Sequence, residues 1–395
     1  MNTKVERMNG KTTRRALLAS VLVLAAGLLA PPAAAETVRV TDLAGRTVEV
    51  RVPVKTMILG EGRFVPTLAI LDPSDPSDRI VGMMGDFERF DPAGYAQYVK
   101  AFPRIKGIPQ IGHGSAESFS LEKSISVKPD VAIFGLGSGH GPGARHKAIL
   151  DRLAAAGVPV VVVDFRMEPL VNTPKSIALL GRLLGRDAEA KAFNDFYAAQ
   201  LKRVADGLKG VTDKPKVFIE IHVGGRDDCC ATMSQGMMGR FIDWAGGDNI
   251  AKGKIPGAHG LLSLEYLLVS QPDIYMGTAI GGAGVTYPKP GRIVLGPGAG
   301  EDLARRSLAL ATARRGISDL TAVKTGRAHA IWHNFYNTPL NVAAVQAMAK
   351  WIHPDRFTDL NPHKTLATLF EKFQPVPLDG AYWVSLGAGA EAASK

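Results

Sequence analysis

One short motif occurs twice in the chain, and this repeat limits the possible architectures more than any other feature of the sequence. Ser120-Leu121-Glu122 precedes Pro129-Asp130-Val131, and Ser263-Leu264-Glu265 precedes Pro272-Asp273-Ile274 at the same spacing. The two copies lie 143 residues apart, which is about the length of one domain. In each copy we expect the serine to cap a helix, the glutamate to lie in its first turn, and Pro-Asp to lead into a buried strand. The repeat therefore predicts two similar halves.

Strand and helix signals alternate along most of the chain. A helical pattern from His146 to Ala156, for example, ends at Gly157-Val158-Pro159. Short runs that favour β-structure occupy residues 57–59, 131–134, 160–163, 217–219, 273–276 and 328–331. Alternating strands and helices favour parallel sheets that helices cover on both faces. The predicted fold class is therefore α/β.

The longest helical pattern lies in the middle of the chain. It opens at Thr173-Pro174, is interrupted at Gly185-Arg186-Asp187, and continues to Ala205 with apolar residues at three- and four-residue steps. An ordinary surface helix would show the same pattern, but the position between two α/β halves favours a helix that joins them. The predicted organisation is a signal peptide at 1–35, an N-terminal lobe at 36–172, a helical segment at 173–209, a C-terminal lobe at 210–379 and a flexible tail at 380–395.

The N-terminus has the pattern of a secretory signal peptide. A basic stretch ends at Arg15, residues 16–30 are small or apolar except for Ser20, and Pro31-Pro32 precede Ala33-Ala34-Ala35. Arg14-Arg15 leaves both the general secretory route and the twin-arginine route open. The first cysteine is Cys229, so no lipid anchor is expected after cleavage at Ala35. We expect a soluble protein exported to the periplasm.

The net charge does not indicate a nucleic-acid partner. Lys and Arg total 47 and Asp and Glu total 37, and five of the basic residues lie in the first fifteen positions. The remaining excess is spread along the chain, whereas binding to nucleic acid calls for a clustered basic face.

The two cysteines, Cys229 and Cys230, are adjacent. In an oxidising compartment the first interpretation is a disulfide between these neighbours, and the second is a pair of free thiols that bind a soft metal together with His222. The sequence shows no spacing typical of a closed zinc site, so no resident metal is expected.

Candidate ligand-binding residues follow the predicted strand ends, because ligands of open α/β sheets lie beyond the carboxyl ends of the strands. Arginine recurs in these loops and binds anions through its planar guanidinium group, although each arginine alone is also typical of a solvated loop. Tyrosines and neighbouring aromatic residues offer flat walls for a large ligand. The candidates are Arg63, His140, Arg166, Arg226, Tyr287, His333 and Tyr336. Together they predict a cleft that accepts an acidic chelate.

Catalytic signatures are lacking in the sequence. There is no G-x-S-x-G elbow, H-E-x-x-H pair or catalytic cysteine motif, so no catalytic residue is predicted. The adjacent carboxylates Asp227 and Asp228 are more typical of a solvated turn than of a hydrolase. A secreted metal-dependent hydrolase therefore remains the less favoured alternative.

Several of these features together resemble a known family. The signal peptide, the opening Val40-Thr41-Asp42-Leu43-Ala44-Gly45-Arg46, the repeated Leu-Glu-x6-Pro-Asp motif and the mid-chain helix look like the periplasmic binding proteins of ABC importers for ferric siderophores, haem and cobalamin. The resemblance extends from about Thr37 to Phe373. It implies two Rossmann-like lobes joined by one long α-helix, with the ligand in the cleft between them and little hinge motion.

The resemblance also implies a partner and a cargo. A glutamate on each lobe of such proteins docks onto arginines of the membrane permease dimer, and these glutamates match Glu122 and Glu265. The expected ligand is a ferric siderophore or a similar iron chelate, with cobalamin, haem or an oxyanion such as molybdate as alternatives. The protein is expected to be a monomer without a cofactor. The alternative role of both glutamates is to stabilise the helix starts.

Overall fold

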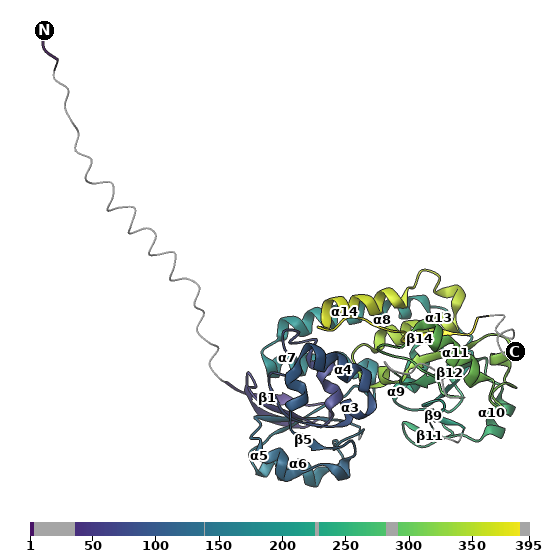
Figure 1. Cartoon of the computed structure of the whole chain (residues 1–395), viewed down its shortest axis with the longest axis horizontal. Helices are drawn as coiled ribbons and strands as arrows, with labels where there is room; N and C mark the ends of the chain where they lie inside the picture. The colour runs from purple at the N-terminus through teal and green to yellow at the C-terminus, as the bar shows by residue number, and fades with distance from the viewer. Residues whose placement is uncertain (4–35, 138, 226–228, 282–290, 388–395) are drawn as a thin grey trace. The chain divides into compact units, whose positions relative to one another are not determined.

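The first half of the chain is built around a five-stranded parallel sheet with the strand order β5-β4-β3-β6-β7 (Figure 1). Its strands are short apolar runs that are largely buried, as the alternation of strand and helix signals predicted. They are β3 (Met57–Leu59), β4 (Ile80–Met84), β5 (Gln110–Gly112), β6 (Val131–Gly135) and β7 (Val160–Val163). A separate two-stranded sheet pairs β1 (Glu36–Thr41) with β2 (Thr47–Val52).

The second half contains a mixed seven-stranded sheet. The path β11-β9-β8-β12-β13-β14 has parallel pairs at its centre, whereas β9, β11 and β14 run antiparallel to their neighbours. β10 pairs with β8 in parallel. The strands are β8 (Lys216–Glu220), β9 (Ala231–Met233), β10 (Asp248–Asn249), β11 (His259–Leu261), β12 (Ile274–Ala279), β13 (Ala328–Trp332) and β14 (Trp383–Ser385). All six strands expected from the sequence are confirmed. The other strands, both the antiparallel ones and the parallel β4, β5 and β10, were not expected.

Helices connect these strands in both halves. Those of the first half are α2 (Val65–Leu68), α3 (Asp86–Phe90), α4 (Pro92–Ala101), α5 (Leu121–Ser126) and α6 (Lys147–Ala155), with 3-10 turns η1 (Gly62–Phe64), η2 (Pro103–Gly107) and η3 (Ala116–Ser118). Those of the second half are α9 (Met237–Trp244), α10 (Leu264–Ser270), α11 (Glu301–Thr312), α12 (Thr321–Lys324), α13 (Asn341–Ile352) and α14 (Pro362–Phe373), with η4 (His333–Asn337) and η5 (Pro354–Arg356).

Two consecutive helices, α7 (Pro169–Leu184) and α8 (Asp187–Gly207), connect the halves. They meet at Gly185, whose φ of 67° is the left-handed conformation that glycine adopts readily at a helix end. α8 packs against α7 and against α13 of the second half. Buried polar groups hold this packing, because the Tyr197 hydroxyl donates to Asn341 Oδ1 at 2.7 Å and Asn341 Nδ2 donates to Thr173 Oγ1 at 3.4 Å. The break between the helices falls at the interruption seen in the sequence, and α8 is the long helix expected between the halves.

The repeated motif forms the same local structure twice. Ser120 Oγ accepts the backbone N–H of Lys123 at the start of α5, and Ser263 Oγ accepts that of Tyr266 at the start of α10. Both serines are therefore N-caps, as predicted.

The ends of the two copies also match. Lys128 and Gln271 precede the Pro-Asp pairs and have φ values of 50° and 41°. Asp130 Oδ2 accepts the N–H of Thr56 at 2.9 Å, just before β3, and Asp273 Oδ2 accepts the N–H of Lys216 at 2.7 Å, the first residue of β8. Each aspartate thus ties its repeat to the central strand of its own sheet.

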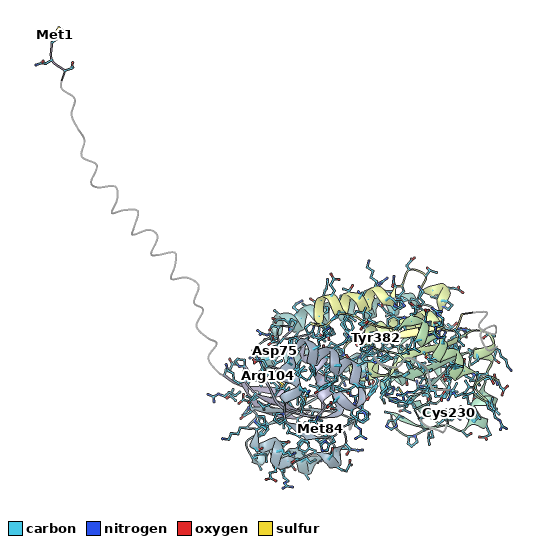
Figure 2. The ribbon with its side chains drawn as sticks, in the orientation of Figure 1. Met1, Asp75, Met84, Arg104, Cys230 and Tyr382 are labelled. Carbon is cyan, nitrogen blue, oxygen red and sulfur yellow. A yellow bond between two sulfur atoms is a disulfide. The ribbon has the colours of Figure 1, made fainter. Side chains whose placement is uncertain are left out.

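The predicted flexible tail is wrong for its first residues. Trp383 and Val384 are buried in β14, which pairs with β13, and Trp383 Nε1 donates to His363 Nε2 at 2.8 Å. Tyr382 beside them is also buried and is labelled in Figure 2. The added strand buries the side chains of Tyr382 and Trp383, and removal of such large apolar side chains from water is favourable.

The computed structural model describes residues 1–3, 36–137, 139–225, 229–281 and 291–387. The predicted signal peptide therefore lies almost entirely outside the described residues. Residues 37–395 form one compact unit. Within the described ranges, no helix combines the length and the apolar character needed to cross a bilayer.

Candidate ligand-binding site

A cavity of about 320 Å³ lies between the two halves of the chain. Residues of both halves line it: Arg63, Phe90 and His140 come from the first, and His222, Val223, Gly225, Ala279, Ile280, Arg292, Ile293, His333, Asn334 and Tyr336 from the second. The presence of a cavity at this position agrees with the cleft that the sequence predicted.

The cavity lies beyond the carboxyl ends of the parallel strands. Arg63 lies in η1, shortly after β3, and His140 follows β6. His222 comes two residues after β8, and His333 directly follows β13 as the first residue of η4. Strand-end loops are the usual ligand-binding positions of open α/β sheets.

Three histidine side chains face this cavity. The ring centroids of His222 and His333 are 3.7 Å apart, and His140 packs against Phe90 with centroids 4.0 Å apart. His333 Nδ1 also lies 2.9 Å from Thr278 Oγ1.

Burial keeps two of the three imidazoles neutral. Burial, together with the nearby Arg63 guanidinium, lowers the pKa of His140 to about 2. Burial likewise lowers the pKa of His333 well below its usual range, and the neighbouring His222 acts in the same direction. A neutral imidazole offers a nitrogen lone pair to a metal ion or to a hydrogen-bond donor.

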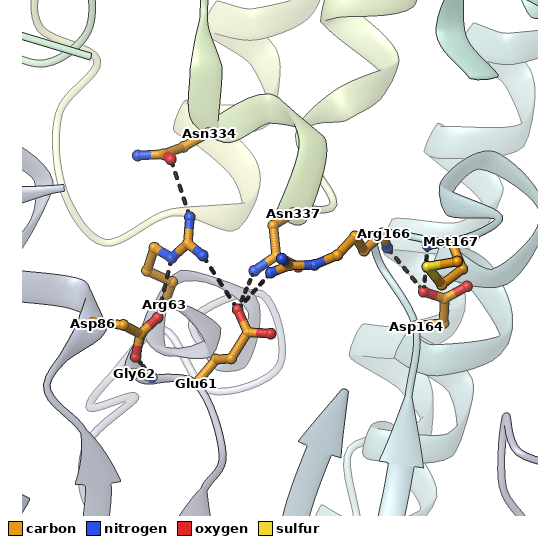
Figure 3. A network of polar contacts seen from close by, with 9 residues as sticks. All are labelled: Glu61, Gly62, Arg63, Asp86, Asp164, Arg166, Met167, Asn334 and Asn337. Carbon is orange, nitrogen blue, oxygen red and sulfur yellow. Dashed lines mark hydrogen bonds and ion pairs between the residues drawn. The ribbon is translucent and has the colours of Figure 1, made fainter. Parts of the chain in front are cut away.

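Two arginines lie close to the ring of Tyr336. The guanidinium carbon of Arg63 lies 5.4 Å from the ring centroid and that of Arg166 lies 4.8 Å from it. Both arginines also pair with one carboxylate, because Glu61 Oε2 is 3.3 Å from Arg63 Nη2 and 2.7 Å from Arg166 Nη2 (Figure 3). Arg63 Nε adds a second pair with Asp86 Oδ2 at 3.1 Å.

The same network joins the two halves of the chain. Asn337 Nδ2 donates to Glu61 Oε2 at 2.8 Å, and Arg63 Nη1 donates to Asn334 Oδ1 at 3.1 Å (Figure 3). Asn334 Nδ2 in turn donates to the carbonyl oxygen of Phe90 at 3.1 Å. These side chains are buried, so each bond satisfies a group that would otherwise be costly to remove from water.

The arginine pair therefore has much less free positive charge than the sequence suggested. Glu61 and Asp86 offset the charges of Arg63 and Arg166 inside the protein. Burial raises the pKa of Asp86 to about 6, although Arg63 favours its ionised form. Arg292 is exposed, lines the cavity and has no carboxylate partner among the described residues, so it is the arginine best placed to meet an anionic ligand.

The structure brings together most of the residues predicted from the sequence. Arg63, His140, His333 and Tyr336 line the cavity, and Arg166 does not line it but lies next to the ring of Tyr336. Arg226 and Tyr287 lie outside the described residues.

Sequence reasoning missed other lining residues. His222 follows β8 closely enough for the strand-end rule to have assigned it to the cleft. Asn334 lies in the loop after the predicted strand 328–331, which the strand-end rule had already assigned to the cleft. Arg292 follows no predicted strand and Phe90 carries no charge pattern, so the sequence offered no signal for these two.

Cys229 and Cys230 form a disulfide, and the described residues contain no free cysteine. Cys230 is buried beside the start of β9 in the second half (Figure 2). Its carbonyl oxygen accepts the N–H of Leu262 at 3.1 Å, and the neighbouring Ala231 carbonyl accepts that of Ile221 at 2.7 Å. The disulfide thus lies between the segment after β8, which carries His222, and the segment that leads to α10. Nowhere in the described ranges do three or more His, Cys, Asp or Glu side chains converge to hold a metal ion.

The two repeated glutamates lie away from the cavity. Glu122 and Glu265 are exposed in the first turns of α5 and α10. In Figure 1 these two helices lie at the lower edge of the molecule, one in each half, whereas α8 and α14 lie along the upper edge.

Comparison with known proteins identifies the family. The family model of the periplasmic binding proteins matches residues 95–327, which is more than half of the chain. The chain belongs to this family. Its members bind small molecules in the periplasm as the binding components of ABC transporters and work with a membrane permease; they are not enzymes.

Solved structures of similar proteins agree with the assignment. The TroA-like periplasmic binding protein FepB from Veillonella parvula is 26% identical, with a TM-score of 0.76 over 89% of this chain and 100% of that one. MolA from Haemophilus influenzae, bound to molybdate, is 16% identical with a TM-score of 0.64 over 87% and 99%. CeuE from Helicobacter pylori, in a Ni-His complex, is 16% identical with a TM-score of 0.61 over 86% and 95%. No curated protein sequence matches the chain.

Proposed function

We propose that this protein captures a metal chelate, such as a ferric siderophore, in the cavity between its halves and delivers it to an ABC permease. The observation that carries the proposal is the lining of the cavity, where three imidazoles lie beside aromatic and aliphatic walls. Imidazole nitrogen binds transition metals, and apolar walls suit the organic part of a chelator. The chelate is cargo, and the protein needs no resident cofactor.

The polar groups around the cavity suit an acidic chelate. Arg292 is exposed at its wall and can pair with a carboxylate or another anionic group of the ligand. Arg63 also lines the cavity, but its bonds to Glu61, Asp86 and Asn334 hold it in place. Its role is to fix the ring of Tyr336 as a rigid wall.

Transport requires export and docking. Residues 1–35 direct the chain to the periplasm and are removed after Ala35, and the mature protein acts as a monomer. Glu122 and Glu265 dock onto arginines of the two permease subunits, which is supported by their exposure at equivalent positions of a duplicated motif. Charge pairs of this kind set orientation and association rate more than affinity.

The ligand assignment can be tested by thermal unfolding of the purified mature protein. A ligand that binds only the folded state raises the melting temperature in proportion to the logarithm of its excess over Kd. We expect a rise with a ferric hydroxamate, a ferric catecholate or ferric citrate, and none with the iron-free chelators. A rise with haem, cobalamin or molybdate alone would refute the iron-chelate assignment and leave the transport role in place.

A matched variant tests whether the histidines take part. His333→Gln keeps a polar side chain of similar size at the cavity wall but offers no imidazole nitrogen. We expect it to weaken binding of the stabilising chelate at least tenfold by titration calorimetry, while His353→Gln, at a site outside the cavity, leaves binding unchanged. Equal affinities for the two variants would show that the histidines do not contact the ligand.

A further inference from the structure

The two copies of the repeated motif differ at several surface positions, and one of these differences places an exposed apolar side chain where the other copy has a polar one. Ser126 lies four residues after Glu122 in α5, and Val269 lies four residues after Glu265 in α10. Residues four apart on a helix share a face, so each side chain lies beside its glutamate. The serine caps, the left-handed residues and the aspartate bonds are the same in both copies. The difference is therefore one of surface chemistry on equivalent backbones.

In and just before the second copy, apolar side chains are exposed to an unusual degree. The exposed fraction of Val269 is 84% and that of Leu261 is 60%, and apart from Met1 no large apolar side chain in the described ranges is more exposed. Leu261 ends β11, an edge strand, four residues before Glu265. The two most exposed of these apolar residues thus flank the same glutamate in the chain.

The first copy has a polar surface instead. Ser126 is exposed and its hydroxyl donates to the carbonyl oxygen of Lys123 at 2.9 Å. Lys123 and Lys128 are exposed on either side of it. Nothing in this copy corresponds to the apolar side chain of Val269.

We infer that the C-terminal docking surface, which we define as Glu265 with the exposed Leu261 and Val269 four residues to either side of it in the chain, binds a permease subunit through a basic residue that lies within an apolar patch. The N-terminal docking surface, formed by Glu122 and Ser126, makes polar contacts only. This inference rests on the proposed docking of both glutamates. The charge of Glu265 selects a basic partner, and burial of the adjacent valine and leucine adds affinity that the N-terminal surface lacks.

The inference has a consequence for how the protein engages its partner. Two halves that dock with the same charge but different apolar area contribute unequally to the complex. The C-terminal half supplies most of the affinity, and the N-terminal half mainly fixes the orientation of the protein on the permease. A permease with two identical subunits would therefore still hold this protein more firmly at one subunit.

The test measures binding of the ligand-free mature protein to its permease–ATPase complex in lipid nanodiscs by biolayer interferometry. We compare Glu265→Gln, the double variant Leu261→Ser plus Val269→Ser, and Ser126→Val. Leu310→Ser is the control, because Leu310 is 48% exposed on α11 and outside the docking surfaces. We expect the double variant to raise Kd about tenfold or more, Ser126→Val to lower it or leave it unchanged, and the control to have no effect.

The outcomes separate this inference from the docking proposal. Weaker binding by Glu265→Gln but normal binding by the double variant would refute the apolar surface and leave glutamate docking in place. No binding by the wild-type protein, or no effect of either glutamate, would refute docking and the inference with it. Binding to protein-free nanodiscs that the double variant loses would assign the surface to lipid, and self-association of the wild type that it loses would assign it to a second copy.

Discussion

Glu61 is the residue whose replacement should most disturb the cavity. Its carboxylate is 2% exposed and accepts bonds from Arg63, Arg166 and Asn337. In Glu61→Gln the side chain keeps its shape and loses its charge, and Arg166 then has no carboxylate partner among the described residues. Removal of one member of a buried ion pair destabilises a protein by about 3 to 5 kcal/mol. Because the new amide oxygen can still accept a bond, we expect a loss of about 2 to 4 kcal/mol.

The assay is urea unfolding followed by circular dichroism, with thermal unfolding as a second measurement. The predicted loss corresponds to a melting temperature lower by roughly 3 to 5 °C for a chain of this size. Glu49→Gln is the matched control: its ion pair with Arg39 is exposed, so the loss there should stay below about 1 kcal/mol.

A double variant tests the reasoning directly. Glu61→Gln plus Arg166→Gln removes one charge of each sign and leaves Arg63 paired with Asp86. Its destabilisation should be smaller than the sum of the two single effects by about 1 to 3 kcal/mol. Additive effects, or a loss for Glu61→Gln no larger than that of the exposed control, would refute the view that Glu61 balances two buried arginines.

Three further changes have defined outcomes. Burial raises the pKa of Asp91 to about 7, so the folded state holds a proton that the unfolded chain releases near pH 4, and stability falls as the pH rises from 4 to 7. Asp91→Asn, which can still cap α4 by accepting the N–H of Gly94, should flatten this pH dependence and stabilise the protein at pH 8 in urea titrations. Tyr336→Leu removes a ring that lies close to two guanidinium groups and should lower stability by about 1 to 3 kcal/mol and weaken chelate binding in calorimetry. Glu122→Ala plus Glu265→Ala should leave ligand affinity unchanged and reduce uptake of the radiolabelled chelate by cells; a loss of ligand affinity would place these residues in the binding site.

Local patterns were enough to predict the layered fold. Buried parallel strands are continuous apolar runs, so residues 131–134 and 160–163 were identifiable without any tertiary information. The serine caps of the repeat likewise depend only on nearby residues. β14 was missed because an antiparallel edge strand so late in the chain is stabilised by contacts with β13, which lies about fifty residues earlier.

The site was predictable in position but not in charge. Strand ends located Arg63, His140 and His333, because that rule depends on topology alone. The pairing of Arg63 and Arg166 with one buried carboxylate depends on side chains that the fold brings together from separate loops. Asn337, which completes the network from the other half, is 276 residues away from Glu61 in the chain. No local pattern reports such a contact.

The bonds of Asp130 and Asp273 connect each copy of the repeated motif to a strand that leads to the cavity. Asp130 binds the segment after α5 to the N-terminal end of β3, and Glu61 follows the C-terminal end of this three-residue strand. Asp273 likewise binds the segment after α10 to the N-terminal end of β8, and His222 follows the C-terminal end of that strand. In each half, the helix with the exposed glutamate and the loop that lines the cavity therefore connect to opposite ends of one buried strand. Closely packed interiors transmit strain. A displacement of either helix would therefore reach the cavity along a single short strand.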